Sequence, residues 1–218
     1  MIEVFYTSFL KPLPESIYSS YLELLPEEMK EHNGKYLRWQ DRHAHLLGKL
    51  LLVYALRNRD YDHQILKAIT LSEYKRPQLS EGFDFNISHS GNHAVCALSW
   101  WGRIGIDIEQ INEVDFKDYE QTMTPPQWAE VKAAEKPYHR FFDYWCIKES
   151  LMKADGRGMY IPLDKLSWAN DQSLLDGQVW HLKKLSLDPG YATYLASDVE
   201  PLEVTVHQVD FNQANVLG

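Results

Sequence analysis

The chain has 218 residues, a length that fits one large domain or two small ones, and its 44% hydrophobic and 24% charged residues are ordinary for a soluble globular protein. The formal net charge of −9 argues against general nucleic-acid binding, which needs a basic surface. Two cysteines and no signal-peptide pattern predict a cytoplasmic protein. Residues 85–102 lack Asp, Glu, Lys and Arg but are too polar to span a bilayer, so no membrane segment is expected.

The first hundred residues predict strands and helices in alternation. Pro77 keeps the Tyr74–Pro77 segment out of a helix, because proline disfavours the helical conformation of the residue before it. In chain order we expect a strand over residues 2–9, a helix over 14–25, a longer helix from about 26 or 35 to 57, an extended segment over 68–73, and strands over 83–88 and 94–99.

A basic stripe follows the long helix. From Lys35 to Arg59 the sequence has six basic residues and one acid. Five side chains recur at spacings of three and four, which places them on one side of a helix: Lys35, Arg38, Arg42, His45 and Lys49. Such a stripe often serves solubility alone. Lysine and arginine are also the side chains that bind phosphate, so a phosphate-binding edge is the alternative.

The segment Gly105-Ile-Asp-Ile-Glu109 alternates apolar and acidic residues with the period of a half-buried strand. Asp107 and Glu109 therefore share one face, while Ile106 and Ile108 anchor the other face in a core. Two neighbouring carboxylates repel each other unless a cation or a proton lies between them, and Mg²⁺ prefers oxygen ligands of this kind. A solvated acidic edge strand is the competing interpretation.

The remaining elements follow from proline, glycine and periodicity. Proline suits the first turn of a helix, and glycine supplies the left-handed residue that ends one. We expect a mobile loop over residues 112–124, a helix opened by Pro125 and Pro126, a helix from Pro137 to Asp155 ended by Gly156 and Gly158, and strands over 166–168, 179–185, 191–197 and 204–209.

The last of these helices carries a mixed polar face. Its members lie at i, i+3, i+4, i+7 and i+8, namely Trp145, Lys148, Glu149, Met152 and Lys153. A surface ion pair between Glu149 and Lys153 would stabilise the helix by only ~0.3–0.5 kcal/mol. The aromatic residues just before Cys146 favour a central helix instead, so we predict a site on this face.

The segment Phe85-Asn-Ile-Ser-His-Ser-Gly91 is a third candidate site. A single histidine such as His89 is more often structural or exposed than catalytic. However, it lies at a strand end, beside Ser88 and a glycine turn, where ligand-binding residues commonly occur.

Two short segments repeat at nearly one offset. Lys49-Leu-Leu-Leu52 matches Lys148-Glu-Ser-Leu151 after 99 positions, and Ala94–Ser99 matches Ala192–Ser197 after 98 positions. These matches predict two halves of similar fold, residues 1–103 and 104–218.

Three segments in this order resemble the 4′-phosphopantetheinyl transferases of the pseudodimeric kind, which activate carrier proteins of peptide and polyketide synthases. They are Phe85–Ser90, Gly105–Glu109 and Trp145–Lys153. The resemblance implies an α+β fold whose two α/β halves form an intramolecular pseudodimer, in a monomeric protein. It also implies transfer of the 4′-phosphopantetheine moiety of coenzyme A to a serine of an apo acyl or peptidyl carrier protein, with Mg²⁺ required and 3′,5′-ADP released.

The same resemblance implies roles for individual residues. Asp107, Glu109 and Glu149 would hold Mg²⁺, which neutralises charge on the transferred phosphoryl group. Glu149 would accept the serine proton and Lys153 would stabilise the leaving phosphate, so the catalytic residues are Asp107, Glu149 and Lys153. The implied coenzyme A contacts are Arg42, Arg76, Pro77, Ser88, His89, Lys148 and Lys153.

The sequence departs from the family pattern at Ala44, where relatives usually carry an arginine; Arg42 is a candidate to replace it, and Lys30 and Lys35 are further candidates. Another Mg²⁺-dependent phosphoryl or nucleotidyl transferase is disfavoured because no glycine-rich phosphate loop is present. A catalytically silent scaffold for carrier proteins is disfavoured because all three acids are present. The expected carrier-protein contacts are Phe116, Tyr119, Met123 and Trp128.

Overall fold

The computed structural model describes residues 1–59, 61, 63–80, 82–200, 203–213 and 216–217. Its helices are α1 (Glu15–Leu22), α2 (Glu27–Gly34), α3 (Trp39–Leu56), α4 (Pro125–Ala133) and α5 (Pro137–Asp155), and its 3₁₀ turns are η1 (Arg57–Arg59), η2 (His63–Ala68), η3 (Phe116–Thr122), η4 (Gly158–Tyr160) and η5 (Leu163–Lys165). Its strands are β1 (Ile2–Ser8), β2 (Thr70–Leu71), β3 (Pro77–Gln78), β4 (Asp84–Ser90), β5 (His93–Ser99), β6 (Ile104–Gln110), β7 (Gln172–Leu175), β8 (Gln178–Lys184), β9 (Tyr191–Ser197) and β10 (Val204–Gln208). None of the described helices is both long enough and apolar enough to span a bilayer.

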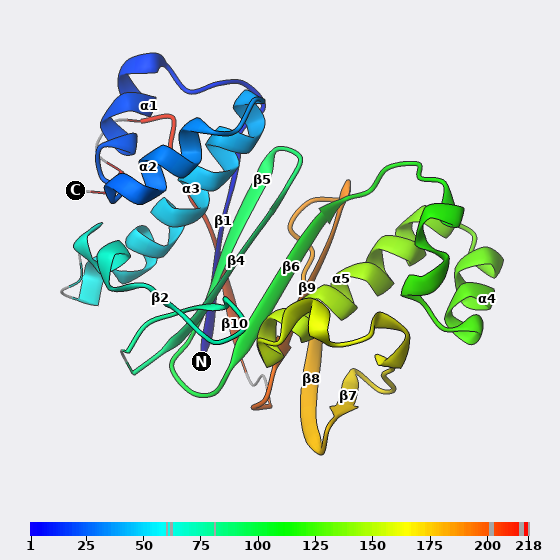
Figure 1. Ribbon diagram of the computed structural model, residues 1–218. Coiled ribbons are helices and arrows are strands. Elements are labelled where there is room, and N and C mark those ends of the chain that lie inside the picture. The colour runs from blue at the N-terminus through cyan, green and yellow to red at the C-terminus, as the bar shows by residue number, and fades with distance from the viewer. Residues whose placement is uncertain (60, 62, 81, 201–202, 214–215, 218) are drawn as a thin grey trace.

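Two four-stranded sheets lie between outer helices, so the fold is α+β as predicted (Figure 1). The first sheet has the order β10-β1-β5-β4 and is covered by α3, and the second has the order β6-β9-β8-β7 and is covered by α5. Strands β1 and β10 are parallel, whereas the other neighbouring strands of these two sheets are antiparallel in the described residues. Both sheets repeat one chain order, in which a strand and a helix precede a hairpin whose second strand pairs with the first strand.

Alternation along the strands creates three apolar layers. In β5, Val95 and Ala97 face the second sheet, while Cys96 and Leu98 face α3. Residues two apart share a strand face, so this strand serves two cores at once and is buried throughout. A third core lies between the second sheet and α5, which contributes Phe141 and other side chains to it.

Side chains of β4, rather than its backbone, pair with the outer edge of β6. Each acceptor lies 20 residues before the amide that it binds, in the series Asp84 with Ile104, Asn86 with Ile106, Ser88 with Ile108 and Ser90 with Gln110. These bonds, of 2.8 to 3.5 Å, satisfy amides that a strand at a sheet edge would otherwise leave unpaired. We refer to these four contacts as the β4–β6 ladder, and they join the two sheets.

The proposed division at residue 103 stays a prediction. The two sequence matches fall on corresponding elements, since Lys49 lies in α3 and Lys148 in α5, while the other pair of segments forms β5 and β9. However, β10 comes from the second half of the sequence and pairs with β1 of the first. The chain beyond it also returns to the first half, because Arg57 donates a hydrogen bond to the carbonyl of Val216.

Most predicted elements are present, with four corrections. The helix predicted over 14–25 ends at Leu22, and the next helical region is divided into α2 and α3 by residues 35–38. The predicted loop over 112–124 contains the 3₁₀ turn η3. The strand predicted over 166–168 is wrong, because the chain there is irregular and β7 begins at Gln172. Helix α5 ends as predicted, at Gly156 with a φ of 91°.

Candidate active site

Helix α5 packs so closely on β6 that only glycine fits at position 105. A Cβ there would overlap the carbonyl oxygen of Ser150 and the amide nitrogen of Ala154 in α5. The isoleucines of β6 enter the core between the sheets. Asp107 and Glu109 therefore lie on the α5 side, on one strand face as the alternation predicts. Both carboxylates lie near Glu149 of α5, because the charge of Glu149 raises the pKa of Glu109 and the charge of Asp107 raises the pKa of Glu149.

Asp107 is the most buried acid of this group, with 2% of its surface exposed. Its Oδ1 accepts a 2.6 Å hydrogen bond from Lys153 Nζ and a 2.9 Å bond from Ser88 Oγ. Its Oδ2 is buried and has no hydrogen-bond partner among the described residues. A buried carboxylate oxygen without a partner is costly, so this atom is suited to accept a bond from a ligand or a cation.

The other two acids are less buried, and both resist ionisation. Burial, followed by the negative charge of Asp107, raises the pKa of Glu109 to about 7, even though Ser90 Oγ donates a 2.7 Å bond to its carboxylate. Burial also raises the pKa of Glu149, with a further upward contribution from Asp107 and an opposing one from Lys153. Two acids with raised pKa values beside the carboxylate of Asp107 form a site that favours positive charge.

Lys153 supplies one positive charge to this site. Burial lowers the pKa of its amine, but the charge and hydrogen bond of Asp107, together with the charges of Glu149 and Glu109, raise the pKa above its ordinary value overall. Lys153 Nζ also donates a 3.0 Å bond to Ser88 Oγ. The ammonium therefore stays protonated at neutral pH and is fixed by two oxygens at the base of the site.

The chemistry of the acids suits Mg²⁺, which takes oxygen ligands and keeps positions open for phosphate oxygens. The buried, partnerless Oδ2 of Asp107 and the raised pKa of Glu109 and Glu149 both fit a missing positive charge. Within the described parts of the chain, however, no three His, Cys, Asp or Glu side chains are gathered closely enough to hold a metal ion. The residue types therefore fit the metal, while the ligand set is not assembled.

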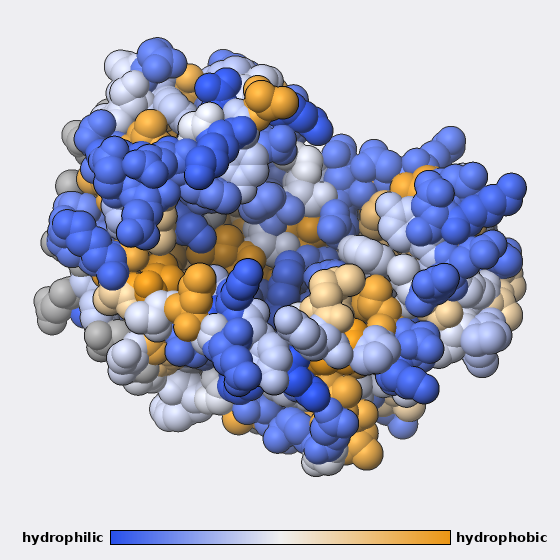
Figure 2. All heavy atoms as spheres, viewed as in Figure 1, coloured by the Kyte–Doolittle hydropathy of each residue, from blue (hydrophilic) through white to orange (hydrophobic). Residues whose placement is uncertain are grey.

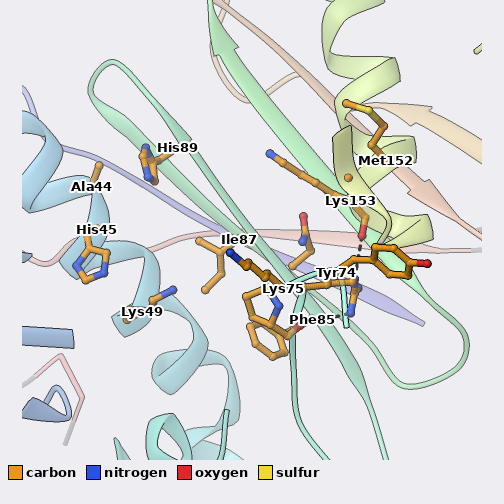
Figure 3. Close-up of a pocket in the computed structure, with 15 residues that line it drawn as sticks. Ala44, His45, Lys49, Tyr74, Lys75, Phe85, Ile87, His89, Met152 and Lys153 are labelled. Atoms are coloured by element: carbon orange, nitrogen blue, oxygen red, sulfur yellow. Dashed lines mark hydrogen bonds between the residues drawn. The ribbon is translucent and has the colours of Figure 1, made fainter. Parts of the chain in front are cut away.

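A pocket of about 320 Å³ lies beside the acids, between α3, the 74–77 turn, β4 and the end of α5. The space-filling view is hollowed between the two helices, and the close-up shows Lys49 and His45 on the α3 side and Lys153 on the α5 side (Figures 2 and 3). The residues that line it are Ala44, His45, Lys49, Tyr74, Lys75, Arg76, Pro77, Phe85, Asn86, Ile87, His89, Met152, Lys153, Gly156 and Gly158. Its basic and aromatic lining is suited to a nucleotide or another anionic ring compound.

Comparison with known proteins identifies the family. The sequence is 33% identical over 172 residues to the 4′-phosphopantetheinyl transferase gsp of Aneurinibacillus migulanus, covering 75% of this chain and 70% of that protein. The chain belongs to the 4′-phosphopantetheinyl transferase superfamily. The family profile with that description matches residues 103–193. The transferase is also 29% identical over 197 residues to the 4′-phosphopantetheinyl transferase Sfp of Bacillus subtilis (strain 168), covering 83% of this chain and 85% of that protein.

One solved structure gives only a distant likeness. The crystal structure of Thermotoga maritima holo-[acyl-carrier-protein] synthase (AcpS) matches with a TM-score of 0.37 and 16% sequence identity, covering 44% of this chain and 61% of that one. The family assignment rests on the sequence relatives, and from them the protein is a transferase enzyme.

In this transferase the predicted arginine substitute is not in the pocket. Arg42 is exposed, and its backbone carbonyl accepts a 2.8 Å bond from Asn33. The pocket wall from α3 is formed instead by Ala44, His45 and Lys49. Successive residues of a helix point in directions 100° apart. The basic residues predicted to share one stripe therefore span a wider sector of α3 than the part that faces the pocket. The predicted coenzyme A contact by Arg42 stays a prediction, and the lining of this pocket gives it no support.

Arg76 lines the pocket, but its guanidinium is occupied inside the protein. It forms a two-pronged ion pair with Asp84 at 2.9 and 2.7 Å, and its Nε donates to the carbonyl of Lys153 at 2.8 Å. The remaining donors reach the carbonyls of Pro77 at 3.5 Å and Ile104 at 2.9 Å. A guanidinium has five N–H groups, and this set uses them all, so Arg76 braces both sheets and α5 rather than offering donors to phosphate.

Lys148 lies apart from the pocket, so its predicted coenzyme A contact also stays a prediction. Its side chain has no exposed surface, and its Nζ donates to the carbonyls of Thr122 at 2.8 Å and Leu163 at 2.7 Å. These carbonyls belong to η3 and η5, away from the pocket. Burial lowers the pKa of Lys148 to about 8. Lys148 therefore ties two turns to α5 and does not share the face of Glu149 and Lys153.

The other predicted pocket residues divide between two places. Pro77 and His89 line the pocket, and burial, with the charges of Lys153 and Lys49, lowers the pKa of His89. Ser88 lies in the acid cluster, because its hydroxyl bridges Lys153 and Asp107. The predicted coenzyme A contact by Ser88 stays a prediction, and in this structure its hydroxyl orients Lys153 and Asp107.

Several pocket residues were not predicted as site residues. His45 and Lys49 were recognised only as part of the basic stripe, and Tyr74, Lys75 and Phe85 were not assigned a role. The sequence held one usable signal for the turn: an aromatic and a basic residue directly precede Arg76-Pro77. Lys75 adopts a φ of 62°, an uncommon conformation for a residue other than glycine, and such positions often occur at ligand sites.

A second hollow of about 930 Å³ lies over η3 and α4. Of the four predicted carrier-protein contacts, Phe116, Met123 and Trp128 line it. Tyr119 instead packs edge-on against Phe141 and Trp145. This hollow and the acid cluster lie in the same half of the sequence, on either side of α5.

Proposed function

We propose that this enzyme transfers the 4′-phosphopantetheine moiety of coenzyme A to a serine of an apo acyl or peptidyl carrier protein, with Mg²⁺ required, and releases 3′,5′-ADP. The family membership supports the transferase activity on carrier proteins. The metal requirement and the nucleotide product are what the resemblance to this family implies, and the acids of the site support the metal requirement.

The contact between Lys153 and Asp107 carries this proposal. One carboxylate oxygen is held by the ammonium at 2.6 Å, and the other is buried without a partner among the described residues. The site thus keeps a fixed cation and an open acceptor at the border of a basic pocket. This pairing suits a diphosphate, which needs positive charge on both sides of the bond that breaks.

Each reacting group has a residue to serve it. Lys153, protonated at neutral pH, would stabilise the negative charge that develops on the departing phosphate. Glu149 would accept the proton of the attacking serine, since its raised pKa makes it a stronger base than an ordinary carboxylate. Ser88 would keep Lys153 and Asp107 in register through its two hydrogen bonds.

Asp107, Glu109 and Glu149 would hold the metal. When bound, Mg²⁺ supplies charge neutralisation and orients the phosphate oxygens. Before that, the raised pKa of Glu109 keeps part of the site neutral, so the acids need not repel one another in the free protein.

The hollow over η3 and α4 is proposed as the carrier-protein contact. Its apolar floor comes from Phe116, Met123 and Trp128, and charged residues of both signs also line it: Lys117, Lys132, Asp115 and Glu120. An apolar centre with a charged border suits a protein partner that buries apolar side chains. Because both walls of the catalytic site come from one chain, we propose that the enzyme acts as a monomer. Two buried, free cysteines support a cytoplasmic location, and the net negative charge argues against nucleic acid as a partner.

Mass spectrometry of an apo carrier protein tests the proposal. Incubation with the enzyme, coenzyme A and Mg²⁺ should add one phosphopantetheine to the carrier and produce 3′,5′-ADP in equal amount. Removal of the metal with EDTA and the Asp107→Asn variant should each abolish the gain, while circular dichroism of the variant stays like that of the wild type. Carrier binding without any mass gain would favour the silent scaffold. Transfer of a nucleotidyl group instead would favour the other class of Mg²⁺-dependent transferase.

A further inference from the structure

Ser90 lies at the end of β4, beside the acid Glu109 of β6. Its hydroxyl oxygen accepts a 3.1 Å hydrogen bond from the backbone amide of Gln110 and donates a 2.7 Å bond to Glu109 Oε2. A serine hydroxyl has a single proton, and the amide already occupies its acceptor side. The proton of Ser90 is therefore directed at one particular oxygen of the Glu109 carboxylate.

The turn that follows Ser90 keeps this hydroxyl in place. Gly91 has a φ of 53°, and a Cβ there would lie 2.5 Å from Gln110 Oε1 and 2.6 Å from the hydroxyl oxygen of Tyr191. The amide of Asn92 donates a 3.1 Å bond to the same tyrosine oxygen. The turn between β4 and β5 is thus packed against the ends of β6 and β9, so Ser90 has little freedom to move away from Glu109.

Both acids of β6 are held through one oxygen each. Asp107 Oδ1 accepts a bond from Ser88, and Glu109 Oε2 accepts one from Ser90. Among the described residues, no hydrogen bond reaches Asp107 Oδ2 or Glu109 Oε1. The carboxylate of Glu149 receives none from these residues either, so it is left to turn toward a bound cation. The pair on β6 is therefore the part of the site that is oriented in advance.

The number of oxygens that a carboxylate offers affects which cation it suits. Mg²⁺ is small and demands near-ideal octahedral geometry, whereas Ca²⁺ takes more ligands in a flexible arrangement and often binds both oxygens of one carboxylate. Partners that hold a ligand from behind fix its orientation toward the metal. A glutamate with one oxygen fixed by a hydroxyl presents the other oxygen alone, which favours Mg²⁺.

We propose that Ser90 is a positioning residue that restricts Glu109 to one oxygen and thereby makes the site prefer Mg²⁺ to Ca²⁺. This inference rests on the proposed function, in which Glu109 is one of the metal ligands. It assigns Ser90 a role beyond the β4–β6 ladder, where its contact with the amide of Gln110 only joins the two sheets.

Calorimetric titration of MgCl₂ and of CaCl₂ into the enzyme, with saturating coenzyme A and no carrier protein, tests this role. The wild type should bind Mg²⁺ more tightly. Ser90→Ala should weaken Mg²⁺ binding by roughly 10- to 100-fold, the range found when a partner of a metal ligand is removed. Binding of Ca²⁺ should weaken less than about threefold, because Ca²⁺ accepts a rotated carboxylate. The ratio of the two dissociation constants is the measured quantity, since altered protonation of Glu109 would affect both cations equally.

Two conservative variants and one matched control separate positioning from a purely structural role. Ser90→Thr keeps the hydroxyl and should keep the wild-type ratio. Ser90→Cys has a weaker donor and should shift the ratio in the direction of Ser90→Ala, but less. Asn86→Ala removes another contact of the β4–β6 ladder, the 2.9 Å bond from the amide of Ile106, without removing a bond to an acid. It should lower the melting temperature and leave the ratio unchanged.

The possible failures are distinguishable. An unchanged ratio in Ser90→Ala, or an equal shift in Asn86→Ala, would overturn the role of Ser90. A wild type that prefers Ca²⁺ would overturn it as well. In these cases the proposed transfer reaction would stand if the wild type still modifies a carrier with Mg²⁺. A wild type that binds neither cation would overturn the inference together with the metal requirement of the proposed function.

Discussion

Lys148→Met separates the role that the structure gives this lysine from the cofactor role predicted from the sequence. The substitution removes two hydrogen bonds of a charged donor, each worth ~1.5–3 kcal/mol, to the carbonyls of Thr122 and Leu163. It also removes a buried charge. A fall of the pKa from 10.5 to about 8 corresponds to about 3 kcal/mol of cost for the charged form. These effects partly cancel, so the free energy of unfolding should fall by ~1–3 kcal/mol.

Urea denaturation followed by tryptophan fluorescence measures this loss, and calorimetric titration measures coenzyme A affinity in the same variant. Affinity should stay within about twofold of the wild type, because Lys148 does not line the pocket. Lys153→Met, on the same helix, is the control that should lose turnover. A Lys148→Met variant with wild-type stability and a tenfold loss of coenzyme A affinity would refute the reasoning and restore the sequence-based role.

The pH dependence of the same variant adds an independent check. The pKa of Lys148 is about 8 in the folded protein and 10.5 in the unfolded chain, so the unfolded chain binds more protons between these values. Stability of the wild type relative to Lys148→Met should therefore rise as the pH increases from about 8 to 10.5. A difference that is flat or falls over this window would contradict the burial of a charged amine.

Three further substitutions test the acid site and its support. Glu149→Gln should lower kcat by ~10²-fold or more while coenzyme A affinity changes little, and equal losses in both would reduce Glu149 to a binding group. Without metal, the wild type should lose stability relative to Glu109→Gln as the pH rises from 4.5 to about 7, because the folded pKa of Glu109 is raised. A wild type that gains stability relative to the variant over this range in denaturation curves would be inconsistent with that shift. Gly105→Ala should destabilise the protein by ~3 kcal/mol or prevent folding, since the new methyl group overlaps backbone atoms of α5, and a variant with a wild-type melting temperature would show that α5 can move away.

The acidic strand could be predicted from the sequence because a single rule governs it. Alternation of Ile106 and Ile108 with Asp107 and Glu109 has the period of a strand, and nothing in the tertiary structure overrides it. The ends of α5 could also be predicted from local sequence, because proline favours the first turn of a helix and glycine favours the left-handed residue that ends one, as at Pro137 and Gly156. The α+β class follows from such local patterns, whereas the meeting of the two sheets depends on contacts far apart in the chain.

Lys148 and Arg76 show where the sequence gives no guidance. Lys148 and Lys153 are five residues apart on one helix, so their side chains leave the helix in directions that differ by 140°. The final position of a long side chain such as that of Lys148 is set by the hydrogen-bond acceptors within its reach. Those partners are backbone carbonyls, which every residue possesses and no sequence pattern marks. Arg76 is similar, because the carbonyls of Lys153 and Ile104 come from distant segments.

The β4–β6 ladder also bears on how this protein could be dissected. Its four acceptors occupy the amides along the free side of β6, where another polypeptide could otherwise add a strand. Two of them, Ser88 and Ser90, also hold the acids Asp107 and Glu109. Expression of the C-terminal half alone would therefore expose the unpaired edge of β6, which promotes aggregation. It would also remove the hydroxyl partners of Asp107 and Glu109, so the isolated half should be neither soluble nor active.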